Sequence, residues 1–211
     1  MALVKYNNNS ISAITAASSL PTGAMTLIKE QTASSSSTID FLNGTSDVVF
    51  DGTYPIYLFK FINIHPATDN TNFSFQVDTG TNTSYNITCT STWFMASHGE
   101  GDAGGGLSYE GSQDQAQGTA FQNIIADHGN ANDKACSGEL WLFSPSSSTF
   151  VKHFMAVGSG LTHETGHVTN HYNPFVAGYF NTTTALTRVR FKMSSGNIDT
   201  GTFKLYGIKD S

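Results

Sequence analysis

The sequence predicts an all-β protein, an antiparallel two-sheet sandwich of jelly-roll-like type preceded by an extended N-terminal arm. Fifteen phenylalanines and eight tyrosines lie in a chain of 211 residues of which only 12% are charged. Many of these aromatic residues alternate with Gly, Asn, Ser or Thr, and a period of two places apolar side chains on one face of a strand. The clearest runs are 73–77 and 188–193, where Arg188, Arg190 and Lys192 interleave with three apolar residues.

The overall composition favours a single domain and argues against nucleic acid and membranes as partners. A chain of this length buries roughly 70% of its unfolded surface, which is enough for a core without metal or disulfide staples. The net charge is −6, whereas proteins that bind nucleic acid concentrate Lys and Arg, so we expect no nucleic-acid partner. No stretch reaches the roughly 20 apolar residues of a membrane-spanning helix, and residues 1–10 lack the apolar core of a signal peptide. We therefore expect no membrane partner and synthesis in a cytoplasm.

Residues 1–38 are expected to form the N-terminal arm. Polar tracts at 7–10 and 34–37 flank small apolar residues that follow no sustained helical stripe, and such a segment buries little surface by itself. A polar arm of this kind is ordered only where something holds it. We expect it to dock on its own domain, on a neighbouring subunit or on a capsid.

Residues 39–211 are expected to form the β-sandwich domain. The run 56–64 is apolar on both faces, with Ile64 on the face opposite Phe61, which predicts a central strand covered on each side. Residues 73–77 are predicted as its hairpin partner, and 120–126 as a short helix or strand. Further strands are predicted at 85–93, 139–143, 150–157, 175–180, 185–193 and 202–208.

The alternation stops at residues 98–117, where six glycines occur among Ser, Gln and Asp. Loops of this length are uncommon in compact domains and are usually functional or mobile. We expect a long, exposed, glycine-rich loop over about 98–117.

One motif suggests chemistry. The segment His163-Glu164-Thr165-Gly166-His167 matches the H-E-x-x-H pattern of zinc metalloproteases, with His171 as a third nitrogen. In those enzymes the motif lies on a helix, so that both imidazoles bind one zinc and the glutamate acts as general base. The flanking Gly, Thr, Asn and Pro residues make a poor helix, and in an extended chain His163 and His167 lie about 13 Å apart. We therefore expect no catalytic residues, no metal site and no cofactor, although adventitious metal binding by His163, His167 or His171 stays open.

Acidic residues and glycines in the 98–117 segment give weaker signals. Asp102, Glu110 and Asp114 match no calcium-loop spacing and are interpreted as solvated loop residues. The run Gly104-Gly105-Gly106 lacks the lysine and the strand-to-helix context of a phosphate-binding loop.

The tryptophans and cysteines are interpreted as structural. Trp93 and Trp141 have large apolar neighbours, which favours core positions over platforms that stack on sugars. Cys89 and Cys136 are too few for a disulfide framework. Cys89 shares the alternate positions of a strand with Ile87, which favours a buried thiol over a bridge.

Three segments carry a resemblance to a known group of proteins. They are 27–41 (LIKEQTASSSSTIDF), 54–68 (YPIYLFKFINIHPAT) and 193–208 (MSSGNIDTGTFKLYGI). Each resembles structural proteins of tailed bacteriophages, especially those that infect marine cyanobacteria and related marine bacteria, whereas residues 95–170 depart from it. The resemblance implies a non-enzymatic virion protein, either a capsid decoration (cement) protein or a head or tail fibre. It also implies location in the virion after assembly in the host cytoplasm. The expected partners are the major capsid protein or another virion protein and copies of the chain itself, with a trimer as the expected oligomer.

Two other functions remain open at this point. The first is a receptor-binding module in which the glycine-rich loop and Trp93 or Trp141 recognise host-surface glycans. The second is a zinc metallohydrolase that uses His163, Glu164 and His167.

Overall fold

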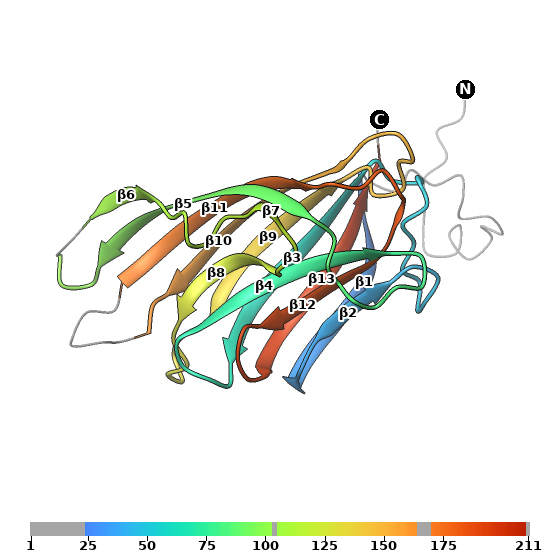
Figure 1. Ribbon diagram of the computed structural model, residues 1–211. Helices are drawn as coiled ribbons and strands as arrows, with labels where there is room; N and C mark the ends of the chain where they lie inside the picture. Colours follow the sequence, from blue (N-terminus) through green and yellow to red (C-terminus); the bar gives the residue numbers. More distant parts are fainter. Residues whose placement is uncertain (1–23, 103–104, 164–169, 210–211) are drawn as a thin grey trace, which may run out of the picture.

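The computed structural model describes residues 24–102, 105–163 and 170–209, and all regular structure in them is β-strand (Figure 1). These residues form thirteen strands in two antiparallel sheets, which confirms the predicted all-β sandwich. The strands are β1 (Met25–Ser36), β2 (Ile39–Leu42), β3 (Ile56–Pro66), β4 (Thr71–Thr79), β5 (Cys89–Gly99), β6 (Gly106–Tyr109), β7 (Ala116–Gly118), β8 (Gln122–His128), β9 (Cys136–Phe143), β10 (Lys152–Leu161), β11 (Asn170–Phe180), β12 (Leu186–Met193) and β13 (Ile198–Ile208).

The two sheets differ in size. The larger has nine strands in the order β1-β13-β3-β9-β10-β11-β5-β6, with β7 also paired to β5, and the smaller has four strands in the order β2-β12-β4-β8. The connection 37–38 takes the chain from β1 in the larger sheet to β2 in the smaller one. In Figure 1 the smaller sheet lies across the inner side of the larger one, and the strands β5, β6 and β11 extend beyond it.

Aromatic rings fill the space between the sheets. On β12 the apolar residues Val189, Phe191 and Met193 are at most 3% exposed, and the three cations that alternate with them point away from the core, as the period of two predicts. The ring of Phe191 is the centre of this cluster. Its centroid lies 5.1–6.2 Å from those of Phe41, Phe59, Phe61, Phe73, Phe75 and Phe203.

Strand β3 is central, as predicted, because it lies between β13 and β9. The prediction that 73–77 is its hairpin partner was wrong, because β4 belongs to the smaller sheet. The prediction was also wrong about the faces of β3. Asn63 has a left-handed backbone (φ 51°), and the register against β9 shifts between Phe61 and Ile64. This β-bulge turns Ile64 to the same buried face as Phe61. The opposite face is the outside of the sandwich, where Ile62 is 41% exposed, so apolar residues on both faces do not mark two covering layers here.

The arm boundary predicted at residue 38 differs from the structure. Residues 25–36 form β1, an edge strand of the larger sheet that pairs with β13 from Met25–Ile208 to Ser36–Ile198. Ala33 of this strand is buried in the core. The polar composition was misleading because an edge strand is held mainly by backbone hydrogen bonds and buries few side chains. The rest of the predicted arm, residues 1–23, lies outside the described residues.

The predicted loop 98–117 is partly regular structure. Strand β5 continues to Gly99, β6 pairs with it from Phe94–Tyr109 to Ser97–Gly106, and β7 pairs with its beginning. Backbone pairing along a sheet edge needs no apolar pattern, so periodicity could not reveal these strands. The segment is nevertheless well exposed, since Leu107 is 75% and Tyr109 59% exposed.

A buried histidine lies at the end of β8. His128 is fully buried, and its Nδ1 lies 2.9 Å from the carbonyl oxygen of Leu161, so this nitrogen carries the hydrogen. Burial in the core lowers the pKa of His128 from its ordinary value of 6.5, because desolvation disfavours the imidazolium.

We expect His128 to make the protein less stable in acid. Because its pKa is lower in the folded chain, the unfolded chain binds more protons below pH 6.5. The contribution of neutral His128 to the free energy of unfolding is complete above pH 6.5 and is lost as the pH falls towards the folded pKa. The free energy of unfolding then falls by up to about 1.4 kcal/mol per pH unit. In urea unfolding at several pH values, the free energy of unfolding of His128→Gln, which keeps an N–H donor for Leu161, should depend less steeply on pH than that of the parent. His153→Gln, at an exposed position of β10, is the control for loss of an imidazole. Equal slopes for the parent and His128→Gln would contradict this expectation.

Candidate functional site

The H-E-x-x-H segment is described only at its beginning. The N–H of His163 donates to the carbonyl oxygen of Asp127 (2.8 Å), and His171 lies on β11 with Nε2 2.9 Å from Ser159 Oγ. Glu164 and His167 lie outside the described residues, so the geometry of the proposed zinc site is not tested. Within the described residues, no three His, Cys, Asp or Glu side chains are grouped so that they could hold a metal ion.

The acidic residues of the 98–117 segment are spread along the β5–β6 hairpin and the turn after it. Asp102 lies 3.6 Å from the imidazole of His98, Glu110 accepts a hydrogen bond from the Ser108 hydroxyl (2.7 Å), and Asp114 accepts one from the Tyr109 hydroxyl. Each carboxylate thus has a different local partner, and the part of the chain that the structure describes does not bring the three together. Gly106 begins β6, a strand and not a helix, while Gly104 lies outside the described residues.

Both cysteines are buried free thiols, which confirms the interpretation of Cys89. Desolvation raises the pKa of each thiol to about 12. Neither residue therefore supplies a thiolate nucleophile near neutral pH.

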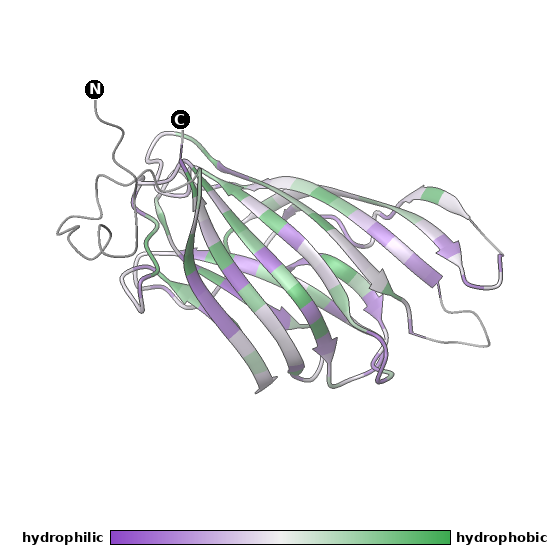
Figure 2. Ribbon diagram, turned by 180° about the vertical axis from the view of Figure 1, so that it is seen from behind, coloured by the Kyte–Doolittle hydropathy of each residue, from purple (hydrophilic) through white to green (hydrophobic). Residues whose placement is uncertain are grey.

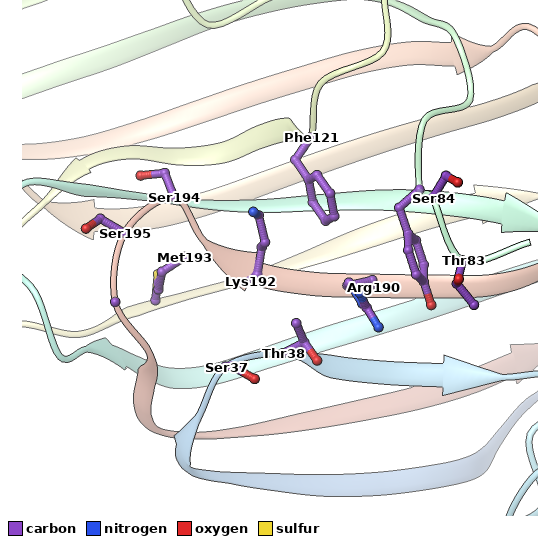
Figure 3. A pocket seen from close by; sticks show the side chains of 12 residues that line it. Ser37, Thr38, Thr83, Ser84, Phe121, Arg190, Lys192, Met193, Ser194 and Ser195 are labelled. Carbon is purple, nitrogen blue, oxygen red and sulfur yellow. The ribbon is translucent and has the colours of Figure 1, made fainter.

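Arg190 and Lys192 of β12 line a polar pocket of about 350 Å³ on the outer side of the smaller sheet (Figure 3). Arg190 makes a bidentate pair with Asp40, at 2.6 and 2.7 Å, and its guanidinium lies over the Tyr85 ring at 4.1 Å. The hydrogen bond to Asp40 raises the pKa of Arg190. Lys192 points towards the ring of Phe121, 4.7 Å from its centroid. Arg190 is thus paired with a carboxylate within the fold, whereas the ammonium group of Lys192 lies against an aromatic ring.

The two tryptophans have different environments. Trp93 faces the interior and is 1% exposed, so its ring offers no surface on which a sugar could stack. Trp141 lies on the opposite face of the larger sheet, is partly buried, and donates from Nε1 to Glu139 (2.9 Å). The prediction that both are core residues is confirmed for Trp93 and was wrong for Trp141.

The outer face of the nine-stranded sheet carries most of the exposed apolar side chains. Eight large hydrophobic side chains are exposed in the described residues, and seven of them lie on this face, whereas Phe150 lies in the β9–β10 loop. We call this surface the outer sheet face. Its seven exposed members come from five strands: Met25, Leu27, Ile62, Phe94, Leu107, Tyr109 and Met155.

Strand register joins four of these residues, together with less exposed neighbours, into two rows that cross the sheet. The first row is apolar except at its end and contains Leu27, Tyr206, Leu58, Trp141, Met155, Ala177 and Thr92. The second row contains Glu30, Lys204, Lys60, Glu139, Val157, Phe175, Phe94 and Tyr109. Figure 2 shows the molecule from the side of this sheet, with apolar and polar residues alternating along the strands.

The charges of the second row neutralise one another. Lys204 Nζ lies 3.0 Å from Glu30, and Lys60 Nζ lies 3.9 Å from Glu139. In the other half of the row the rings of Phe94 and Phe175 stack with centroids 5.2 Å apart. The outer sheet face is therefore an apolar surface with paired charges, a composition typical of contact with another macromolecule.

Sequence reasoning missed this face as a candidate site. The signal was present in β3 and in 139–157, where large apolar residues such as Trp141 and Met155 occupy the positions between buried ones. Such residues were interpreted as core. Only the sheet order shows that no strand of the described residues packs over them.

Comparison of the chain with models of protein families, with curated proteins and with solved structures finds no match. Within the described residues there is no helix with the length and apolar character needed to cross a membrane.

Proposed function

We propose that the protein is a non-enzymatic structural component of a bacteriophage virion, of the capsid decoration or head-fibre type. The outer sheet face is the observation that carries the proposal. Exposed apolar patches rimmed by polar residues are characteristic of surfaces that contact another protein. The partner is the major capsid protein or another virion protein, together with copies of the chain.

Two features support this class of function. The segments 27–41, 54–68 and 193–208 that resemble phage structural proteins correspond to β1–β2, β3 and β13. The resemblance therefore covers three neighbouring strands of the larger sheet, which carry Glu30, Lys204 and Lys60 of the second row. Charged side chains on a docking face fix the orientation of a partner and suppress wrong partners more than they add affinity. The outer sheet face, with exposed apolar side chains and paired charges, thus suits specific docking of many copies of the chain on a capsid.

The test is incorporation into particles of the phage that encodes the chain. The copy number of the protein on purified particles is measured by quantitative mass spectrometry for the parent, Met155→Glu and Ile62→Glu. We expect each variant to be incorporated at least about tenfold less, because a buried unpaired carboxylate in an interface costs several kcal/mol. The matched control Phe150→Glu, at a 70% exposed residue outside the face, should keep the parent copy number.

Two outcomes would contradict the proposal. One is absence of the chain from purified particles, and the other is parent-like incorporation of both outer-face variants.

The contribution of the arm is tested separately by deletion of residues 1–23, because a deletion of 1–38 would also remove β1 and its buried Ala33. The trimer stays a prediction, to be checked by light scattering of the purified protein.

A further inference from the structure

A small pocket lies between β5 and β11 of the larger sheet and β8 at the edge of the smaller sheet. It has a volume of about 100 Å³. Trp93 and Met95 from β5 and Tyr172 from β11 line it together with Glu110 and Asp127. Trp93 and Tyr172 are buried, whereas Asp127 is exposed. Residues of the predicted glycine-rich loop, Glu110 among them, thus meet a buried tryptophan.

One of the residues that line the pocket, Trp93, has a buried hydrogen-bond donor without a partner. The Nε1–H of Trp93 bonds to no described residue, although the side chain is 1% exposed. The Nε1–H of Trp141, the other tryptophan of the chain, has Glu139 as its acceptor at 2.9 Å. A buried unpaired donor costs about 1–3 kcal/mol, so an acceptor atom that enters the pocket recovers this energy.

A carboxylate with free acceptor capacity lines the same pocket. Glu110 is held beside Trp93 because its N–H donates to the Trp93 carbonyl oxygen at 3.0 Å, and the turn is closed by the N–H of Gln113 on the Glu110 carbonyl oxygen at 3.0 Å. Its Oε1 accepts from the Ser108 hydroxyl, and its Oε2 accepts from no residue in the described ranges. A buried donor and a carboxylate acceptor therefore belong to residues that line the same small cavity.

The hydrogen-bonding capacities of the Trp93 indole N–H and the Glu110 carboxylate restrict the kind of ligand that the pocket can bind. A hydroxyl group both accepts and donates, so it can serve Trp93 and Glu110 together. An ammonium group only donates and would leave the indole N–H unpaired, while the carboxylates of Glu110 and Asp127 repel an anion. Met95, Ala126 and Tyr172 supply apolar walls for C–H groups. The volume suits a molecule of the size of glycerol or one edge of a hexose.

We propose that this pocket binds the hydroxyl groups of a carbohydrate, with the indole N–H of Trp93 as donor and the carboxylate of Glu110 as acceptor. The site is distinct from the outer sheet face and does not depend on the role of that face in assembly. It recognises the edge of a sugar and not its ring face, which the burial of Trp93 excludes.

The test uses the two indole N–H signals of the full-length protein in ¹H–¹⁵N spectra. Methyl glucoside, methyl galactoside, N-acetylglucosamine and glycerol are added separately, with sodium acetate as the anionic control. We expect at least one glycoside to shift the Trp93 signal with a dissociation constant in the range of roughly 1–100 mM, while Trp141 stays unshifted. Glu110→Gln, at a partly exposed residue, should weaken binding about tenfold, because the carboxylate is the stronger acceptor.

Three results would overturn the proposal. The first is that no probe shifts the Trp93 signal, which would mean that the pocket holds water only. The second is that both indole signals shift alike, and the third is that Glu110→Gln, with the melting temperature of the parent, binds the same glycoside equally well.

Discussion

Replacement of Phe191 by alanine is expected to lower the free energy of unfolding by about 3–5 kcal/mol, a large part of the 5–15 kcal/mol typical of a domain. Phe191 is fully buried and its ring contacts six other phenylalanine rings from both sheets. The substitution removes this contact area and leaves a cavity that rigid neighbouring strands cannot fill.

The measurement is urea unfolding followed by tryptophan fluorescence. Phe191→Leu, which fills more of the cavity, should lose less stability than Phe191→Ala and keeps the comparison possible if the alanine variant does not fold. Phe150→Ala, at a 70% exposed residue, should change the free energy of unfolding by no more than about 0.5 kcal/mol. A loss below about 1 kcal/mol for Phe191→Ala would contradict the central position of this ring.

Gly178→Ala is expected to lower the free energy of unfolding by about 1–3 kcal/mol through overpacking. A Cβ atom at Gly178 would lie 2.5 Å from the carbonyl oxygen of Thr90, 2.8 Å from Ser91 Cβ and 2.9 Å from Phe154 Cζ. Gly178 pairs with Ser91 on β5 and with Phe154 on β10, so the clash cannot be relieved without moving backbone of the sheet.

The matched control is Gly106→Ala on β6. A Cβ atom there would meet no atom within 4 Å, so thermal and urea unfolding should be within about 0.5 kcal/mol of the parent. Equal stability of Gly178→Ala and Gly106→Ala would show that β5, β10 and β11 are less closely packed at this point than the structure indicates.

The candidate sites were accessible to sequence reasoning only in part. Trp93 and the 98–117 segment were singled out together as a possible glycan site, but as a stacking platform, because the sequence does not show that the indole ring faces the core while Glu110 folds back beside it. The outer sheet face was missed for a related reason. A period of two identifies the two faces of a strand but does not tell whether a second layer covers both.

The sequence by itself determined that the chain is all-β, and it located the apolar side chains of β12 and β4 that lie between the sheets, because successive side chains of a strand point to opposite faces. The tertiary structure decided which strands are neighbours and where that period is interrupted. The bulge at Asn63 reversed the face of Ile64, and pairing with β13 made residues 25–36 an edge strand of the sheet. Both outcomes depend on hydrogen bonds between backbone segments far apart in the chain, and backbone groups are the same in every residue except proline, so side-chain pattern carries little information about them.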